Sequence, residues 1–159
     1  MIDIYSVSGC CSEDFCEYIN FWKHNGYWLF NSPCVMQQIA IDISLDISDC
    51  TLFFYESYEK QFDQIKEIWR SYEPEQAFET NVIEPKSRSL EGFDVCCFSG
   101  GVDPECSPLS CGCLASKIPV NRHCLFDTFR AAFDAIENGQ FANSEPGPLR
   151  IIAVYSVTP

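Results

Sequence analysis

Alternating apolar and polar positions predict strands at both ends of the chain and in its middle. The N-terminal segment MIDIYSV follows this period closely enough to predict a first strand. TLFFYESY is rich in strand-forming residues, and further strands are expected around 78–83 and 93–98. After a turn at 145–148, LRIIAVYSV predicts a closing strand with a mostly apolar core.

Apolar residues spaced three and four apart predict helices between these strands. One is expected near 13–24, with Ser12 as its N-cap and Asn25-Gly26 as its end. A second is expected near 33–41, because Pro33 suits the first helical position. A short third helix is suggested by four apolar residues at helical spacing: Phe62, Ile65, Ile68 and Trp69.

The clearest helical pattern follows Asp127, which we take as the N-cap. Its apolar face consists of Phe129, Ala132, Phe133 and Ile136. Asn138-Gly139 supplies the end of this helix.

Residues 99–119 show no periodicity and are dominated by glycine, proline, serine and cysteine, which predicts a long ordered loop. Strands and helices alternate elsewhere without a regular βαβ repeat. We therefore expect one α+β domain over residues 1–159, with a mixed or antiparallel sheet backed by three to four helices.

The net charge is −13, from 10 lysines and arginines against 23 aspartates and glutamates. This charge argues against binding to nucleic acid or to an anionic membrane surface. Residues 1–94 contain 17 acids and 6 bases, whereas 95–159 contain 6 acids and 4 bases. A basic protein partner would explain the excess, and a uniformly acidic, solvated surface would explain it equally well.

The N-terminus lacks the features of a secretory signal, and no apolar run is long enough to span a bilayer. We therefore expect a cytoplasmic protein whose eleven cysteines are mostly reduced, buried thiols. In the vicinal pairs Cys10-Cys11 and Cys96-Cys97, extended backbone predicts one buried thiol and one that is exposed or at an edge.

The loop PECSPLSCGCL and the residues after it contain a set of possible metal ligands. They are Cys106, Cys111, Cys113, His123 and Cys124. Zinc prefers about four thiolate or imidazole ligands, but this spacing differs from two separated C-x-x-C pairs. Packed thiols remain the alternative to a zinc site, and a thiol nucleophile assisted by His123 or His24 is a third possibility.

Sequence signatures of other enzymes are missing. The chain has no G-x-x-x-x-G-K-[ST], G-x-G-x-x-G, G-x-S-x-G or H-E-x-x-H motif. Nucleotide binding, Rossmann cofactors, serine hydrolysis and zincin chemistry therefore have no support in the sequence, and we expect a protein that is not an enzyme and needs no cofactor.

The stretch from 42 to 84 interleaves acidic and aromatic residues, which is typical of an interface with a basic partner. We expect the following residues to contact that partner: Asp42, Asp46, Asp49, Glu56, Tyr58, Glu59, Asp63 and Glu67. The alternative is a solvated face whose aromatic rings turn into the core.

Four segments resemble a group of small acidic bacterial proteins that has no activity to transfer. They are NGYWLFNSP, LFFYESYE, EPGPLRIIAVY and the run LEGFDVCCFSGGVDPECSPLSCGCLASKIPVNRHCLF. In size, charge and single-domain build the chain is also similar to immunity proteins, which bind and block a toxin made by the same cell. The similarity to immunity proteins implies a binding protein that neutralises a basic toxin or enzyme by occlusion. The alternative is a metal- or thiol-dependent enzyme that uses the Cys106–Cys124 loop.

Overall fold

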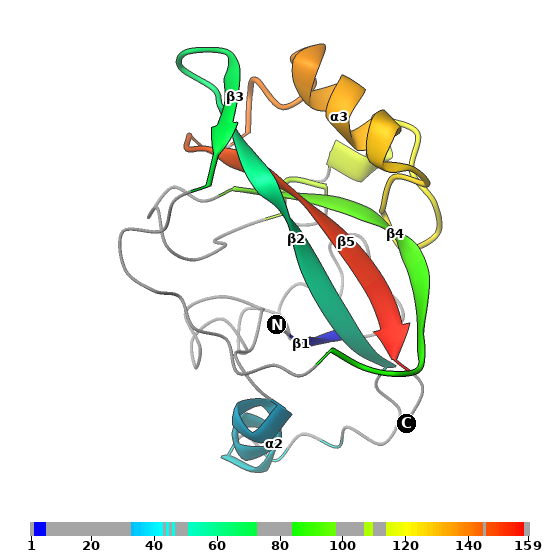
Figure 1. Cartoon of the computed structure of the whole chain (residues 1–159). Helices are drawn as coiled ribbons and strands as arrows, with labels where there is room; N and C mark the ends of the chain where they lie inside the picture. The colour runs from blue at the N-terminus through cyan, green and yellow to red at the C-terminus, as the bar shows by residue number, and fades with distance from the viewer. Residues whose placement is uncertain are drawn as a thin grey trace.

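The structure, a computed structural model, describes residues 2–5, 33–42, 44, 46, 51–72, 84–97, 107–109, 114–144 and 146–157. These residues are built around an antiparallel sheet of five strands (Figure 1). The strands are β1 (Ile2–Tyr5), β2 (Thr51–Asp63), β3 (Ile68–Ser71), β4 (Arg88–Cys97) and β5 (Leu149–Val157). The order across the sheet is β1-β2-β5-β4, and β3 also pairs with β2.

The described residues include two α-helices, α2 (Pro33–Asp42) and α3 (Phe129–Glu137), and a short 3-10 helix, η1 (Leu114–Ser116). In Figure 1, α3 lies over one end of the sheet and α2 lies beyond the other end, near β1. The expected α+β fold with three to four helices behind the sheet is therefore wrong, because the described part is mostly sheet. The helix predicted near 13–24 and the strand predicted near 78–83 fall outside the described residues.

The third predicted helix is a β-hairpin instead. We call residues 59–71, which comprise the end of β2, the turn and β3, the β2–β3 hairpin. Phe62 and Trp69 face each other across it, with their ring centroids 5.4 Å apart. Ile65 and Ile68, which would share a helical stripe with them, are exposed. The helical spacing was misleading because cross-strand pairing, not helical periodicity, brings the two aromatic rings together.

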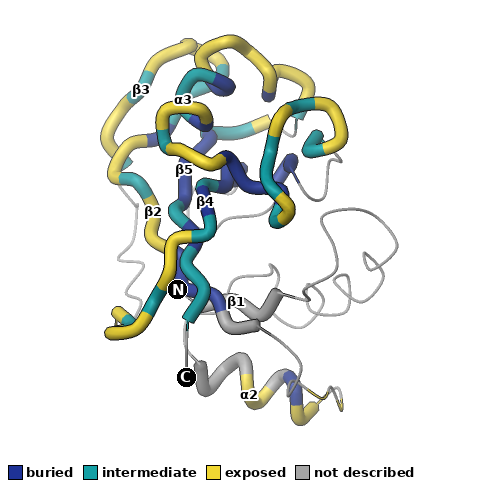
Figure 2. The backbone as a smooth tube through the Cα atoms, turned by 90° about the vertical axis from the view of Figure 1, so that its right-hand side faces the viewer, coloured by how far each residue is buried: buried dark blue, intermediate teal, exposed yellow. Residues whose placement is uncertain are grey.

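The core lies between α3 and one face of the sheet. Figure 2 shows buried positions concentrated where β4 and β5 pass beneath α3. Val95 and Ile151 are register partners on neighbouring strands, and both belong to this core together with Ala132 of α3. Trp69 stacks on Phe133 of α3, with ring centroids 4.6 Å apart and planes 8° from parallel. This stacking fixes the β2–β3 hairpin against the helix.

Helix α3 begins one residue later than the sequence suggested. Thr128 is its N-cap, and its hydroxyl accepts a hydrogen bond of 3.1 Å from the amide of Ala131. Asp127, the predicted cap, is exposed and precedes the cap. The predicted end of the helix is confirmed by Gly139, whose φ of +71° suits the left-handed region.

A loop over residues 121–126 is held against the outer edge of β4. Phe93 and Phe126 exchange two backbone hydrogen bonds of 2.9 Å. Next to them, Gly92 has a φ of +150°, and a Cβ there would lie 2.7 Å from both the Leu125 Cβ and the Phe126 carbonyl oxygen. A glycine is therefore required where this loop, which carries His123, meets the sheet.

Candidate functional site

The structure does not assemble the predicted cysteine and histidine ligands within the described residues. Cys124 is disulfide-bonded, so its sulfur is not the free thiolate that zinc needs. Cys106, Cys111 and Cys113 lie outside the described residues. Elsewhere in the described part, no group of three histidine, cysteine or acidic side chains is placed to hold a metal ion. Cys124 is therefore an exception to the expectation that most of the cysteines are reduced.

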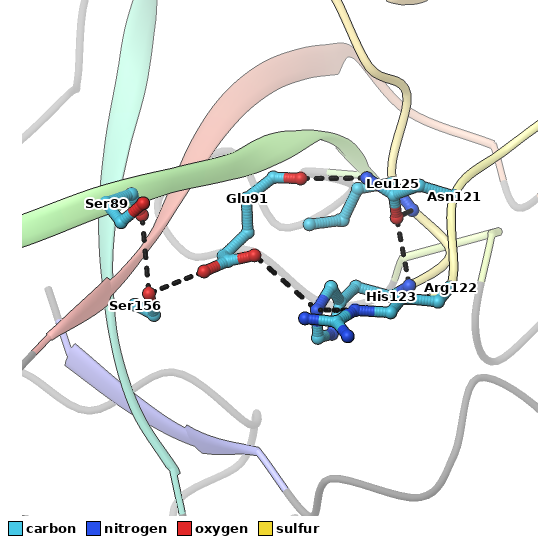
Figure 3. A network of polar contacts seen from close by, with 7 residues as sticks. All are labelled: Ser89, Glu91, Asn121, Arg122, His123, Leu125 and Ser156. Atoms are coloured by element: carbon cyan, nitrogen blue, oxygen red, sulfur yellow. Dashed lines mark hydrogen bonds and ion pairs between the residues drawn. The ribbon is translucent and has the colours of Figure 1, made fainter.

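His123 instead belongs to a polar network around Glu91 (Figure 3). One oxygen of the Glu91 carboxylate accepts a 2.5 Å hydrogen bond from the Ser156 hydroxyl, and the other lies 3.5 Å from His123 Nε2. Arg122 Nε is 3.0 Å from the same imidazole nitrogen. This nitrogen accepts from Arg122 only without a proton and pairs with Glu91 only with one. The two contacts are therefore alternatives.

The order of these contacts does not suit nucleophilic catalysis. In a catalytic triad the serine hydroxyl is hydrogen-bonded to the imidazole that removes its proton. Here Ser156 is bonded to Glu91, which separates the hydroxyl from His123. Asn121 completes the network by donating to the Glu91 carbonyl (2.8 Å) and accepting from the His123 amide (2.9 Å). The network fastens the 121–126 loop to β4 and β5.

A second polar group is buried at Asp94, on the sheet face opposite the α3 core. Its carboxyl oxygen Oδ1 accepts hydrogen bonds from the Ser107 hydroxyl (2.6 Å) and the Val95 amide (2.8 Å). The Cys96 Sγ lies 3.8 Å from the other oxygen. The Asp94 residue is 1% exposed, and this burial raises the pKa of Asp94 to about 7 although the hydrogen bonds oppose the shift.

Cys96 and Cys97 are both fully buried, so the expectation that one of this pair would be exposed is wrong. Both carry reduced thiols. Cys97 packs in the α3 core, and Cys96 points to the other face beside Asp94. Burial, followed by the charge of Asp94, raises the pKa of the Cys96 thiol well above its ordinary value. This thiol therefore lacks the thiolate character of a nucleophile.

The acidic residues predicted to contact a partner do not form one patch. Asp42 ends α2 and Asp46 follows it, at the end of the molecule away from the β2–β3 hairpin (Figure 1). Asp49 lies outside the described residues. Glu56 lies 3.8 Å from Arg88 and accepts a hydrogen bond from Tyr155, so its charge is partly engaged within the molecule.

The remaining predicted contacts lie in or beside the hairpin, with different exposures. Tyr58 is half-buried, and its ring meets that of Phe129 edge-on at 4.8 Å. Asp63 accepts two backbone hydrogen bonds in the turn, from residues 65 and 66 at 3.1 Å each, and the bond from residue 66 is the main reason that its pKa is lowered. Glu59 and Glu67 are exposed. These two are therefore the acids of the hairpin that are exposed to a partner.

Acidic and basic residues are distributed unequally between the described residues and the rest of the chain. Thirteen of the 23 acidic residues and nine of the ten basic ones lie in the part that the structure describes. The remaining ten acids and one base belong to segments outside it. The described part is thus only moderately acidic, and most of the excess negative charge is carried by the other segments.

A cleft of about 300 Å³ lies between the β2–β3 hairpin and the C-terminal end of α3, and we call it the hairpin cleft. Its large apolar lining residues are Phe62, Ile136, Phe141 and Leu149, and the small residues Gly139 and Ala142 also line it. Its polar lining consists of Gln64, Glu67 and Glu137. The cleft therefore combines an apolar surface with two carboxylates that come from opposite sides.

Three long-range hydrogen bonds shape the hairpin cleft. The indole N–H of Trp69 donates to Glu137 at 2.9 Å and links β3 to the last turn of α3. The Gln64 amide lies 3.4 Å from both the Phe141 carbonyl oxygen and the Ser144 hydroxyl. Both sides of the cleft are thus tied to each other before any ligand arrives.

Sequence reasoning missed both Asp94 and the hairpin cleft. A signal for Asp94 was present, because a lone carboxyl in the apolar run FDVCCF is unusual in a buried strand. The cleft had no local signal, since Glu67 and Glu137 are 70 positions apart in the chain. Only the packing of the hairpin on α3 brings them to one cavity.

Comparison of the chain with family models, curated proteins and solved structures shows no match. The resemblances noted from the sequence therefore remain predictions. No helix in the described residues is both long and apolar enough to cross a membrane.

Proposed function

We propose that this protein acts by binding a basic protein partner and blocks that partner by occlusion, as immunity proteins do. The observation that carries the proposal is the exposed end of the β2–β3 hairpin. Ile65, in the turn, is 95% exposed, and Ile68, at the start of β3, is 50% exposed. Large apolar side chains beside charged ones are typical of the centre and rim of a protein interface.

The hairpin is suited to this role because it is held in place from behind. Phe62 and Trp69 pack on each other, and Trp69 stacks on Phe133 of α3. Asp63 and the Trp69–Glu137 hydrogen bond fix the turn and its outer strand. An interface element that is already ordered loses less conformational entropy on binding.

The net charge of −13 favours a partner of opposite charge. Long-range attraction would speed the encounter, and exposed Glu59 and Glu67 would pair with bases around the contact. The apolar contact of Ile65 would then determine how long the complex lasts. Occlusion needs no catalytic group, so this function does not depend on a nucleophile.

The experiment is affinity capture from the cells of origin with three immobilised proteins: the wild type, Ile65→Lys and Ile41→Lys. Ile41 is the matched control because it is 71% exposed but lies on α2, at the opposite end of the molecule. We expect a basic protein to bind the wild type and Ile41→Lys in equal amounts, and Ile65→Lys to bind it at least about tenfold more weakly.

The captured partner is then purified and its association rate with the wild type is measured at several salt concentrations. The rate should fall steeply with salt if charge steers the encounter. An acidic partner, or loss of binding in Ile41→Lys but not in Ile65→Lys, would contradict the proposal.

A further inference from the structure

We infer that the hairpin cleft receives the side chain of a lysine or arginine of the partner. This inference rests on the proposed function, because it specifies what part of a basic protein is recognised. The cleft opens beside the hairpin turn that carries Ile65, and its lining includes Phe62, Gln64 and Glu67 of the hairpin. A partner seated on Ile65 would therefore have this cavity within reach of its neighbouring side chains.

The size and lining of the cleft suit a long side chain with an apolar stem. A volume of about 300 Å³ is at the lower limit for small-molecule pockets and holds one extended side chain. Phe62, Ile136, Phe141 and Leu149 present carbon surface to the methylene groups of such a side chain. Lysine and arginine bury these methylenes on apolar surface and keep their charged group at a polar edge.

Two carboxylates supply the charge that selects a cation. Glu67 comes from the hairpin turn and Glu137 from the last turn of α3, and both are exposed. Glu137 accepts one hydrogen bond from the neutral Trp69 indole, which leaves its negative charge in place. Lys66, in the same turn, is also exposed and offsets part of this charge.

The C-terminal end of α3 also favours a cation in the cleft. A helix carries partial negative charge at its C-terminus, which favours cations there. Gly139 follows the C-cap Asn138 and lines the cleft, and an added Cβ at Gly139 would meet no atom within 4 Å. A ligand can therefore approach the helix end at this point without displacing protein atoms.

The experiment is an NMR titration of the whole chain with Nα-acetyl-arginine methylamide. The Trp69 indole N–H reports binding because it is hydrogen-bonded to Glu137, and Trp69→Phe identifies its signal among those of the three tryptophans. We expect a saturable shift of this signal. The matching citrulline derivative, which has the same shape but no charge, should bind at least about tenfold more weakly.

Variants test whether the cleft is the site. Glu67→Gln and Glu137→Gln should each weaken binding of the arginine probe by about threefold to tenfold. The second change keeps an oxygen acceptor for Trp69. Ala142→Leu, at an exposed position on the cleft wall, should weaken binding by filling the cavity. Asp127→Asn is the control, since Asp127 is an exposed acid that does not line the cleft and is not among the residues expected to contact the partner.

Three results would overturn the inference: the arginine probe leaves the Trp69 signal unchanged, the citrulline derivative binds equally well, or Asp127→Asn weakens binding as much as the cleft variants do. None of these results depends on the captured partner. A failure here with a basic partner still captured through Ile65 would remove the cleft inference and leave the proposed function standing.

Discussion

The carboxyl group of Asp94 lies inside the protein, whereas the two carboxylates of the hairpin cleft lie at its surface. Asp94 is buried, its hydrogen-bond donors among the described residues are neutral, and burial raises its pKa to about 7. Glu67 and Glu137 are exposed at the edge of an open cavity. A closed site of this kind affects stability and its dependence on pH, whereas an open one is available to a ligand.

Among the variants that test this contrast, Asp94→Asn should change the free energy of unfolding most. The pKa of Asp94 is higher in the folded protein than the ordinary 3.8, so the folded protein keeps a proton that the unfolded chain releases between pH 4 and 7. The free energy of unfolding should therefore fall as pH rises through this window, by on the order of 4 kcal/mol. Asparagine does not titrate, so the variant should lack this fall and be more stable than the wild type at pH 8.

Urea unfolding of both proteins from pH 4 to pH 8 measures this difference. Glu91→Gln is the control, because the Glu91 carboxylate has His123 and Ser156 as partners and should gain no such stability at pH 8. Parallel curves for the wild type and Asp94→Asn would show that the buried carboxyl does not control the pH dependence.

Trp69→Ala should have the next largest effect, because it removes the ring that joins the hairpin to α3. Trp69 contacts Phe62 and Phe133 and donates to Glu137. We expect a loss of about 3 kcal/mol in the free energy of unfolding, together with loss of the arginine site. Ile65→Ala, on the same hairpin but 95% exposed, should change stability by less than about 0.5 kcal/mol. Equal effects of the two changes in thermal unfolding would contradict the packing of Trp69 between the hairpin and α3.

A smaller change tests how α3 is held beside the cleft. Thr128→Ala removes the hydroxyl that accepts from the Ala131 amide and should cost about 1 kcal/mol. Asp127→Ala changes the neighbouring exposed residue, which the sequence pattern had suggested as the cap. Its effect should be close to zero. If Asp127→Ala proved the more costly in urea unfolding, the helix would begin where the sequence had placed it.

The smallest effect on stability is expected from Glu67→Gln. Its side chain is exposed in the hairpin turn, so unfolding in urea should change by less than about 0.5 kcal/mol. Glu67 has a φ of +53°, which glutamine adopts at a similar cost. A loss of more than 1 kcal/mol would mean that Glu67 in the hairpin cleft also affects the stability of the fold, as the buried Asp94 does.

Strands β2, β4 and β5 were predictable because each carries a local pattern that suits a sheet. TLFFYESY and LRIIAVYSV are rich in β-branched and aromatic residues, and both lie in strands.

Local patterns gave the wrong structure at residues 62–71. There the spacing of Phe62, Ile65, Ile68 and Trp69 fits a helix, but the hairpin pairs Phe62 with Trp69 and leaves both isoleucines exposed. Propensity is a weak guide where long-range packing on α3 decides the outcome.

The sequence alone was enough to predict the closing strand, the helix that ends just before Gly139, and the net negative charge. These features depend on neighbouring residues or on composition. The folded structure alone shows that Asp94 is buried beside neutral donors in the described part, that His123 meets Glu91, and that Glu67 and Glu137 share a cleft. Residues far apart in the chain make each of these arrangements, so no local pattern encodes them, and their chemistry arises when strands and helix pack together.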